Sequence, residues 1–116
     1  MVNALLILVA GAAVLLVLRV VAGRRGDVRG AEARKLVAGG ARLLDVRTGG
    51  EFASGHLPGA MNIPLGDLER RIPSLGPKDR PIVAYCRSGQ RSGLAKRLLM
   101  ANGFTAVHDL GAMSSW

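Results

Sequence analysis

The sequence predicts an α/β fold in which a central parallel sheet is flanked by helices, preceded by one transmembrane helix. Short apolar segments typical of buried strands alternate with segments of helical periodicity, which is the pattern of a parallel sheet covered on both faces. The chain also opens on an uncharged apolar run. Its 116 residues leave room for only one small domain after that run.

The opening run is long enough to span a membrane. No charged side chain precedes Arg19, and residues 1–22, at about 1.5 Å per helical residue, match a hydrocarbon core of about 30 Å. We expect a retained single-pass anchor over 1–22, while small residues near its end also fit a cleaved signal peptide. Arginines at the end of this run and just after it predict a cytoplasmic location for the domain by the positive-inside rule. They are Arg19, Arg24, Arg25 and Arg29.

A Gly- and Arg-rich linker over 23–30 is expected to lead into the folded domain at 31–116. Helices are predicted where apolar residues recur at three- and four-residue spacing, and strands where short branched apolar runs lie between turn residues. The expected order begins with a helix at 31–38, a strand at 43–46 and an irregular connection at 48–64 that contains a short strand at 60–63. It continues with a helix at 65–72, a strand at 82–85, a helix from 91 to 101 and a strand at 106–107.

Basic residues outnumber acidic ones, and the formal net charge is +8 at pH 7. Such a balance can reflect nucleic acid, anionic lipid or small anionic substrates. We expect no nucleic-acid partner, because the few aromatic residues do not alternate with a basic stripe and no nucleic-acid-binding motif is present. No cluster of Cys, His or acidic residues has metal-ligand spacing, so no metal and no other cofactor is expected.

Cys86 is the only cysteine, and it stands at the end of the strand predicted at 82–85. The following residues have helical spacing, so the thiol falls on a strand-to-helix turn. Backbone N–H groups, the helix dipole and the nearby Arg87 and Arg91 should lower the pKa of the thiol and favour a bound anion. A free cysteine in this position can also be an inert, small buried apolar residue. The flanking sequence has to distinguish between these two interpretations.

Three separated motifs resemble the rhodanese family. They are Leu43-Leu44-Asp45-Val46-Arg47 with Glu51-Phe52, then Gly55-His56-Leu57-Pro58-Gly59-Ala60 with Asn62-Ile63-Pro64-Leu65, and finally Tyr85-Cys86-Arg87-Ser88-Gly89-Gln90-Arg91-Ser92. The resemblance extends from about residue 31 to the end of the sequence and implies a single rhodanese-like domain. It also implies that Cys86 is catalytic and holds a sulfane sulfur as a persulfide.

The same resemblance assigns the loop after Cys86 to substrate binding. Glycine permits a tight turn, backbone N–H groups surround the anionic persulfide, and arginines attract an oxyanion. The expected substrate-binding residues are Arg87, Ser88, Gly89, Gln90 and Arg91. Structural roles near the site are expected for Asp45 and Arg47 as a buried polar pair, and for His56 as a residue that packs the long connection.

The resemblance implies a thiosulfate sulfurtransferase. It would take sulfur from thiosulfate or a persulfide donor and pass it to cyanide or to a small or protein thiol. A non-catalytic binding or regulatory module at the membrane is the alternative, disfavoured because a scaffold does not need Cys86 together with Arg91. A phosphate or arsenate enzyme is a third possibility. It is disfavoured because related phosphatases have arginine six positions after the cysteine, where this chain has Ser92.

Overall fold

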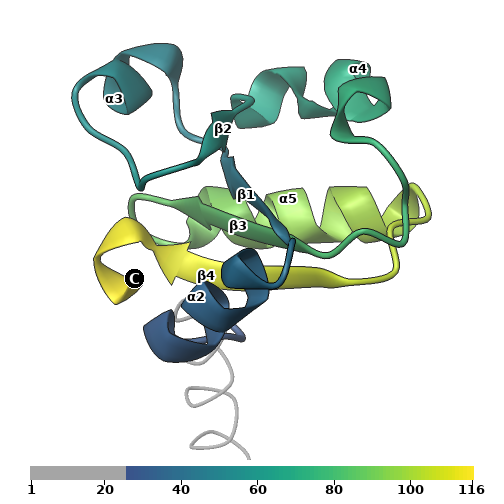
Figure 1. Cartoon of the computed structure of the whole chain (residues 1–116). Helices are drawn as coiled ribbons and strands as arrows, with labels where there is room; N and C mark the ends of the chain where they lie inside the picture. The colour runs from purple at the N-terminus through teal and green to yellow at the C-terminus, as the bar shows by residue number, and fades with distance from the viewer. Residues whose placement is uncertain (1–25) are drawn as a thin grey trace, which may run out of the picture.

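The computed structural model describes residues 26–116, which form a parallel sheet with helices on both faces (Figure 1). Its strands are β1 (Arg42–Asp45), β2 (Met61–Asn62), β3 (Ile82–Cys86) and β4 (Val107–Ala112). They are arranged in the order β2-β1-β3-β4, and every pair is parallel. The α/β fold class predicted from the sequence is confirmed.

The helices divide between the two faces of the sheet. The α-helices are α2 (Gly30–Ala38), α3 (Gly49–Ala53), α4 (Leu68–Arg71) and α5 (Gln90–Ala101). Short 3₁₀ turns, η1 (Leu65–Asp67), η2 (Ile72–Leu75) and η3 (Met113–Ser115), complete the chain. One core packs between the sheet and α4 and α5, and the other packs between the sheet and α2 with the C-terminal turn (Figure 1).

Strand β3 shows how the sheet separates these two cores. All of its residues are buried, as expected for a central strand covered on both sides. Ile82 and Cys86 belong to the core under α4 and α5, whereas Val83 and Tyr85 belong to the core under α2. Because side chains alternate along a strand, the neighbours Tyr85 and Cys86 face opposite sides of the sheet.

Two connections differ from the sequence expectation. The segment at 48–64, expected to be irregular apart from a strand, contains α3. Its start is fixed by a capping box in which the Thr48 hydroxyl accepts the Glu51 N–H and the Glu51 carboxylate accepts the Thr48 N–H. The single helix expected at 65–72 is divided into η1, α4 and η2, and Pro73 lies inside η2.

Strand β4 is longer than the two residues predicted at 106–107, and it carries a bulge. Ala84 of β3 pairs with Asp109, and the next residue, Tyr85, pairs with Gly111. Leu110 is therefore the extra residue, and it turns into the core under α2. The Asp109 Oδ1 atom accepts the Gly111 N–H at 2.8 Å and holds the bulge.

Part of the predicted linker packs against β4. The Asp27 N–H donates to the Asp109 carbonyl at 2.6 Å, and the Asp109 N–H donates to Asp27 Oδ1 at 2.7 Å. Asp27 also forms an ion pair with Lys96 of α5. Gly26 has a φ of +78°, and a Cβ there would lie 2.3 Å from the Asp109 carbonyl oxygen, so this close approach requires glycine.

The anchor expected at 1–22 lies outside the described residues. Over residues 26–116, none of the helices combines the length and apolar character needed to cross a bilayer.

Candidate active site

Cys86 lies at the carboxyl end of β3, between β1 and β4, at the edge of the sheet where sites gather in parallel α/β folds. Gly89 precedes α5 with a φ of +98°, a left-handed conformation that glycine adopts without strain. The resulting turn directs the Gly89 N–H at the sulfur, with 2.9 Å between N and Sγ. The thiol is fully buried, at 0% exposure.

Several hydrogen-bond donors converge on this thiol. Burial raises the pKa of the Cys86 thiol, but its hydrogen bond with the Ser92 hydroxyl and those with backbone N–H groups of Ser92, Gly89 and Ser88 outweigh it, so the net shift is downward. The Cys86 Sγ and Ser92 Oγ atoms are 3.6 Å apart. The loop therefore favours the thiolate, which is the nucleophilic form, in the direction that the sequence predicts.

The five predicted substrate-binding residues follow Cys86 along the loop, in different environments. Arg87, Ser88 and Gln90 are exposed, while Gly89 is buried beneath the turn. Arg91 is partly buried, and its guanidinium is engaged by a residue outside the loop.

That partner is Glu51 of α3. Arg91 Nη1 lies 2.6 Å from Glu51 Oε1, and Nη2 lies 3.0 Å from Oε2, a two-point contact between guanidinium and carboxylate. The pair lowers the pKa of Glu51 to about 2, and it raises the pKa of Arg91. The sequence motifs predict no site role for Glu51. The sequence feature that could have drawn attention to Glu51 was its spacing from Thr48, which is typical of a capping box.

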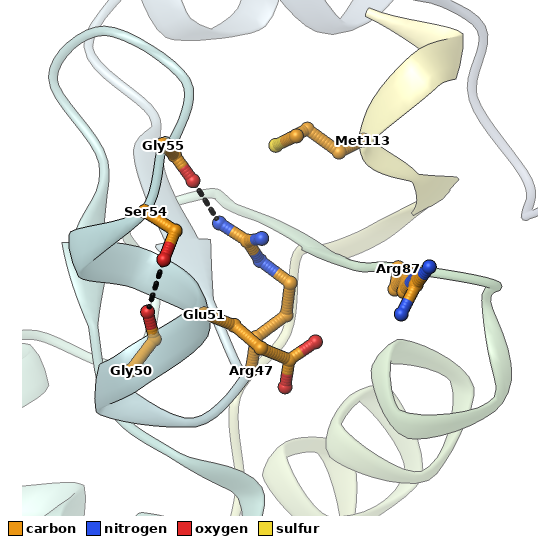
Figure 2. A pocket seen from close by; sticks show the side chains of 7 residues that line it. All are labelled: Arg47, Gly50, Glu51, Ser54, Gly55, Arg87 and Met113. Carbon is orange, nitrogen blue, oxygen red and sulfur yellow. Dashed lines mark hydrogen bonds between the residues drawn. The ribbon is translucent and has the colours of Figure 1, made fainter.

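A pocket of about 390 Å³ opens beside the loop. Figure 2 shows Gly50, Glu51 and Ser54 on one side of it, with Arg87 and Met113 across from them. The lining residues are Arg47, Gly50, Glu51, Ser54, Gly55, Arg87 and Met113. Arg47 is paired with Asp45 and Glu51 is paired with Arg91, so it is the positive charge of Arg87 that favours an anionic occupant. Across the described part of the chain, no three His, Cys, Asp or Glu side chains are grouped as a metal site requires.

Asp45 and Arg47 form a buried ion pair at the end of β1. The Arg47 Nη2 and Asp45 Oδ2 atoms are 2.7 Å apart, and both side chains are almost completely buried. The hydrogen bond to Asp45 raises the pKa of Arg47, against the opposing effect of burial. Arg47 also donates to the Gly55 carbonyl at 2.6 Å (Figure 2), so the pair ties β1 to the connection that forms one wall of the pocket.

Tyr85 supports the same connection from the side of the sheet that faces away from Cys86, where the Arg47 guanidinium lies 5.8 Å from the centroid of its ring. Its hydroxyl accepts the Leu57 N–H at 3.1 Å, and the side chain is fully buried. Burial is the main cause that raises the pKa of Tyr85 to about 12, so the hydroxyl stays neutral at physiological pH.

His56 lies in this connection and is exposed. Its ring stacks on Phe52 with centroids 3.7 Å apart and planes at 5°. Its Nδ1 atom is 2.8 Å from the Phe52 carbonyl oxygen, so a neutral ring with a proton on Nδ1 donates there. These contacts join His56 to α3, and His56 is not among the residues that line the pocket.

Two buried polar residues near Cys86 were not assigned to the site from the sequence. Ser92 is fully buried in the first turn of α5, and Asp109 of β4 is 5% exposed. Burial raises the pKa of Asp109, while the nearby Ser92 hydroxyl and the hydrogen bond from the Gly111 N–H act against it. The sequence feature that could have indicated Asp109 was its place beside a short apolar strand segment. Such a place is typical of residues near the core.

Comparison with known proteins is consistent with this geometry. The Rhodanese-like domain family matches residues 30–116. The chain is 37% identical over 71 residues to the thiosulfate sulfurtransferase PspE of Escherichia coli, covering 60% of this chain and 68% of that protein. It is 35% identical over 102 residues to the human thiosulfate:glutathione sulfurtransferase, covering 73% and 87%.

Other relatives match over similar lengths. The uncharacterized protein YqhL of Bacillus subtilis is 42% identical over 77 residues, which cover 66% of this chain and 60% of that protein. Among solved structures, the human single-domain sulfurtransferase TSTD1 superposes with a TM-score of 0.69 at 33% identity, covering 77% of this chain and 92% of that one.

Proposed function

This chain belongs to the rhodanese-like domain family, and we propose that it is a sulfurtransferase that carries sulfur as a persulfide on Cys86. Relatives that are named sulfurtransferases support sulfur transfer in general. The observation that carries the proposal is the Gly89 N–H held 2.9 Å from the sulfur of a thiol whose pKa is lowered. An anionic sulfur at this position is stabilised by donors that are already in place.

The proposed reaction has two displacement steps. The Cys86 thiolate attacks the outer sulfur of thiosulfate, the sulfur–sulfur bond of the donor breaks, and sulfite leaves with the bonding electron pair. Cyanide or an acceptor thiolate then attacks the outer sulfur of the persulfide, and Cys86 leaves as a thiolate again. The sulfur thus moves with no net change in the oxidation state of the enzyme.

The pocket and the names of the relatives support a choice of donor and acceptor. Arg87 is exposed at the pocket, where it would attract a dianion such as thiosulfate. A persulfide is the second candidate donor. Thiosulfate appears in the names of two relatives and glutathione in one, which supports thiosulfate as donor and a thiol as acceptor. Arg91 would act on the loop through Glu51, and its predicted contact with substrate stays a prediction.

The test is to incubate the full chain with thiosulfate and to measure its intact mass. We expect a gain equal to one sulfur atom, its release as thiocyanate when cyanide is added, and neither result for Cys86→Ser. If the unmodified protein gains no sulfur and forms no thiocyanate, the enzymatic proposal is wrong and the binding-module alternative takes its place.

We further propose that residues 1–22 anchor the chain in a membrane as a single pass, with the domain on the cytoplasmic side. The uncharged opening run and the arginines after it support this arrangement. A reporter fused to the C-terminus should be active in the cytoplasm. An exterior signal would overturn the orientation, and a protein found only in the supernatant after high-speed centrifugation would overturn the anchor.

A further inference from the structure

The Ser92 hydroxyl lies between two acceptors at the base of the loop. Its Oγ atom is 3.6 Å from Cys86 Sγ and 3.2 Å from the Gly89 carbonyl oxygen. Ser92 and Cys86 are both fully buried, so bulk water does not compete for either contact. A serine hydroxyl has one proton to donate, and it rotates to suit its surroundings. Ser92 can therefore donate to the sulfur or to the carbonyl, but not fully to both.

The Gly89 carbonyl does not depend on this proton. It also accepts the Gly93 N–H at 3.2 Å, which is the first main-chain hydrogen bond of α5. When the hydroxyl turns away, the carbonyl keeps this partner, so no buried backbone group is left unpaired. The two positions of the hydroxyl differ by rotation about one side-chain bond, and the backbone does not have to move.

The charge on the sulfur decides which position is favoured. A neutral thiol donates its own proton to Ser92 Oγ, and the hydroxyl then donates to the Gly89 carbonyl. A thiolate has no proton to give, and hydrogen bonds to ionised groups are about twice as strong as those between neutral groups. The hydroxyl then turns to the sulfur. In a persulfide, Sγ is bonded to a second sulfur and carries no charge of its own, so the carbonyl position is favoured again.

The charged side chains on the elements around the thiol are mostly paired with each other. They are Arg87 of the loop, Arg91 of α5 with Glu51 of α3, Asp45 with Arg47 of β1, and Asp109 of β4. All of them remain when the Ser92 hydroxyl alone is removed. A change in the thiol that follows its removal therefore reports on the hydroxyl.

We propose that Ser92 is a catalytic residue whose hydroxyl turns from the Gly89 carbonyl to Cys86 Sγ each time the sulfur becomes a thiolate. This role rests on the sulfur transfer proposed above and belongs to its release step. When cyanide attacks the outer sulfur of the persulfide, a carbon–sulfur bond forms and the sulfur–sulfur bond breaks. The bonding electron pair goes to Sγ, and the Ser92 hydrogen bond stabilises the charge as it develops. Thiocyanate leaves, and no proton is gained or lost.

The loading step gains less from the same hydroxyl. In this step the thiolate is the nucleophile, and its charge decreases as the bond to the donor sulfur forms. A hydrogen bond to the thiolate increases the ionised fraction of the thiol but lowers its nucleophilicity, and the two effects partly cancel. Removal of the hydroxyl should therefore slow release more than loading.

The test compares the unmodified full chain with Ser92→Ala, in which the Gly93 N–H still satisfies the Gly89 carbonyl. The first measurement is the rate of alkylation of Cys86 by iodoacetamide from pH 5 to pH 10, which reports ionisation of the thiol without any sulfur donor. We expect the profile of the variant to move to higher pH. The rate near pH 7 should fall by about tenfold, the effect of one pKa unit.

The second measurement separates the two steps at pH 9. Loading is followed as mass gained from thiosulfate, and release as thiocyanate formed when the purified persulfide protein meets cyanide. Loss of one donor to a developing oxygen anion costs about a hundredfold or more in rate, and sulfur is a weaker acceptor. Release by Ser92→Ala should therefore slow by about tenfold, while loading changes by less than about threefold.

Ser74→Ala is the matched control. It removes an exposed serine hydroxyl that also donates to a carbonyl, that of Arg71 at 2.6 Å, and it should leave the alkylation profile and both steps unchanged.

An unshifted alkylation profile in Ser92→Ala would overturn the role of Ser92 even in a protein that transfers sulfur. Equal slowing of loading and release would also overturn it, because that is the result of a purely structural role. An unmodified protein that gains no sulfur would instead overturn the sulfurtransferase, and with it the release step assigned to Ser92.

Discussion

Arg91 and Glu51 form the contact that joins the Cys86 loop to the wall of the pocket. Their two hydrogen bonds, of 2.6 and 3.0 Å, connect the first turn of α5 to the first turn of α3. The Glu51 carboxylate also accepts the Thr48 N–H that caps α3. The Glu51 carboxylate therefore stabilises both the start of α3 and, through Arg91, the loop that follows Cys86.

This pair predicts a pH dependence of stability. The pKa of Glu51 in the folded protein is about 2, below its ordinary value of 4.5, so its contribution is complete above the ordinary value and is lost as the pH falls toward 2. We expect the free energy of unfolding to decline over this interval, and Glu51→Gln to remove part of that decline. Urea denaturation at a series of pH values measures it, and equal slopes for the two proteins would contradict the prediction.

The buried pair of Asp45 and Arg47 predicts a large stability effect. Asp45→Asn leaves the Arg47 guanidinium buried without its counter-ion, and breaking such a pair costs about 3–5 kcal/mol. Asp67→Asn is the matched control, because it breaks the exposed pair with Arg70, which contributes about 0–1 kcal/mol. Chemical denaturation of both variants should separate them clearly, and similar losses would refute the assignment.

Tyr85→Phe should destabilise the connection that forms one wall of the pocket. The substitution removes the hydroxyl that accepts the Leu57 N–H and leaves a buried donor without its partner, at a cost of about 1–3 kcal/mol. The pKa of the Cys86 thiol should stay unchanged, because Tyr85 faces the other core. Denaturation and the alkylation profile of Cys86 test the two parts, and a shifted profile would show that the faces are coupled.

Gly26→Ala should detach the segment that packs on β4. A side chain there meets the Asp109 carbonyl, and a φ of +78° costs a non-glycine residue about 1–2 kcal/mol. Hydrogen exchange should show loss of protection at the Asp27 and Asp109 amides. Gly66→Ala is the control, because a Cβ there has no neighbour within 4 Å, and it should leave both amides protected.

Helix α3 illustrates which parts of the fold could be predicted. The strands were recognisable because their apolar runs report burial in a sheet. Two glycines at the start of α3 give it poor intrinsic helix propensity, and it depends on the capping box and on Arg91. The second contact joins positions far apart in the sequence, so no local pattern could show it.

The candidate site divides in the same way. Cys86 and the loop residues after it are contiguous, so their meeting at one turn follows from a strand signal next to a helix signal. Asp109 lies beside the first turn of α5 only because β4 pairs with β3, and its carboxylate accepts the Gly111 N–H across the bulge. A bulge depends on pairing between strands, and the sequence around Asp109 predicts only a short strand.

The alternation of Tyr85 and Cys86 across β3 makes the reactivity of the thiol a property of the assembled sheet. Asp45 of β1 lies opposite Tyr85, and a slip of β3 by one residue would reverse the direction of every side chain in the strand. Cys86 would then enter the core under α2, away from Ser92, and Tyr85 would take its place beneath α5. A chain with β3 in the wrong register would hold a thiol without these hydrogen bonds. The lowered pKa of the nucleophile therefore depends on correct strand pairing.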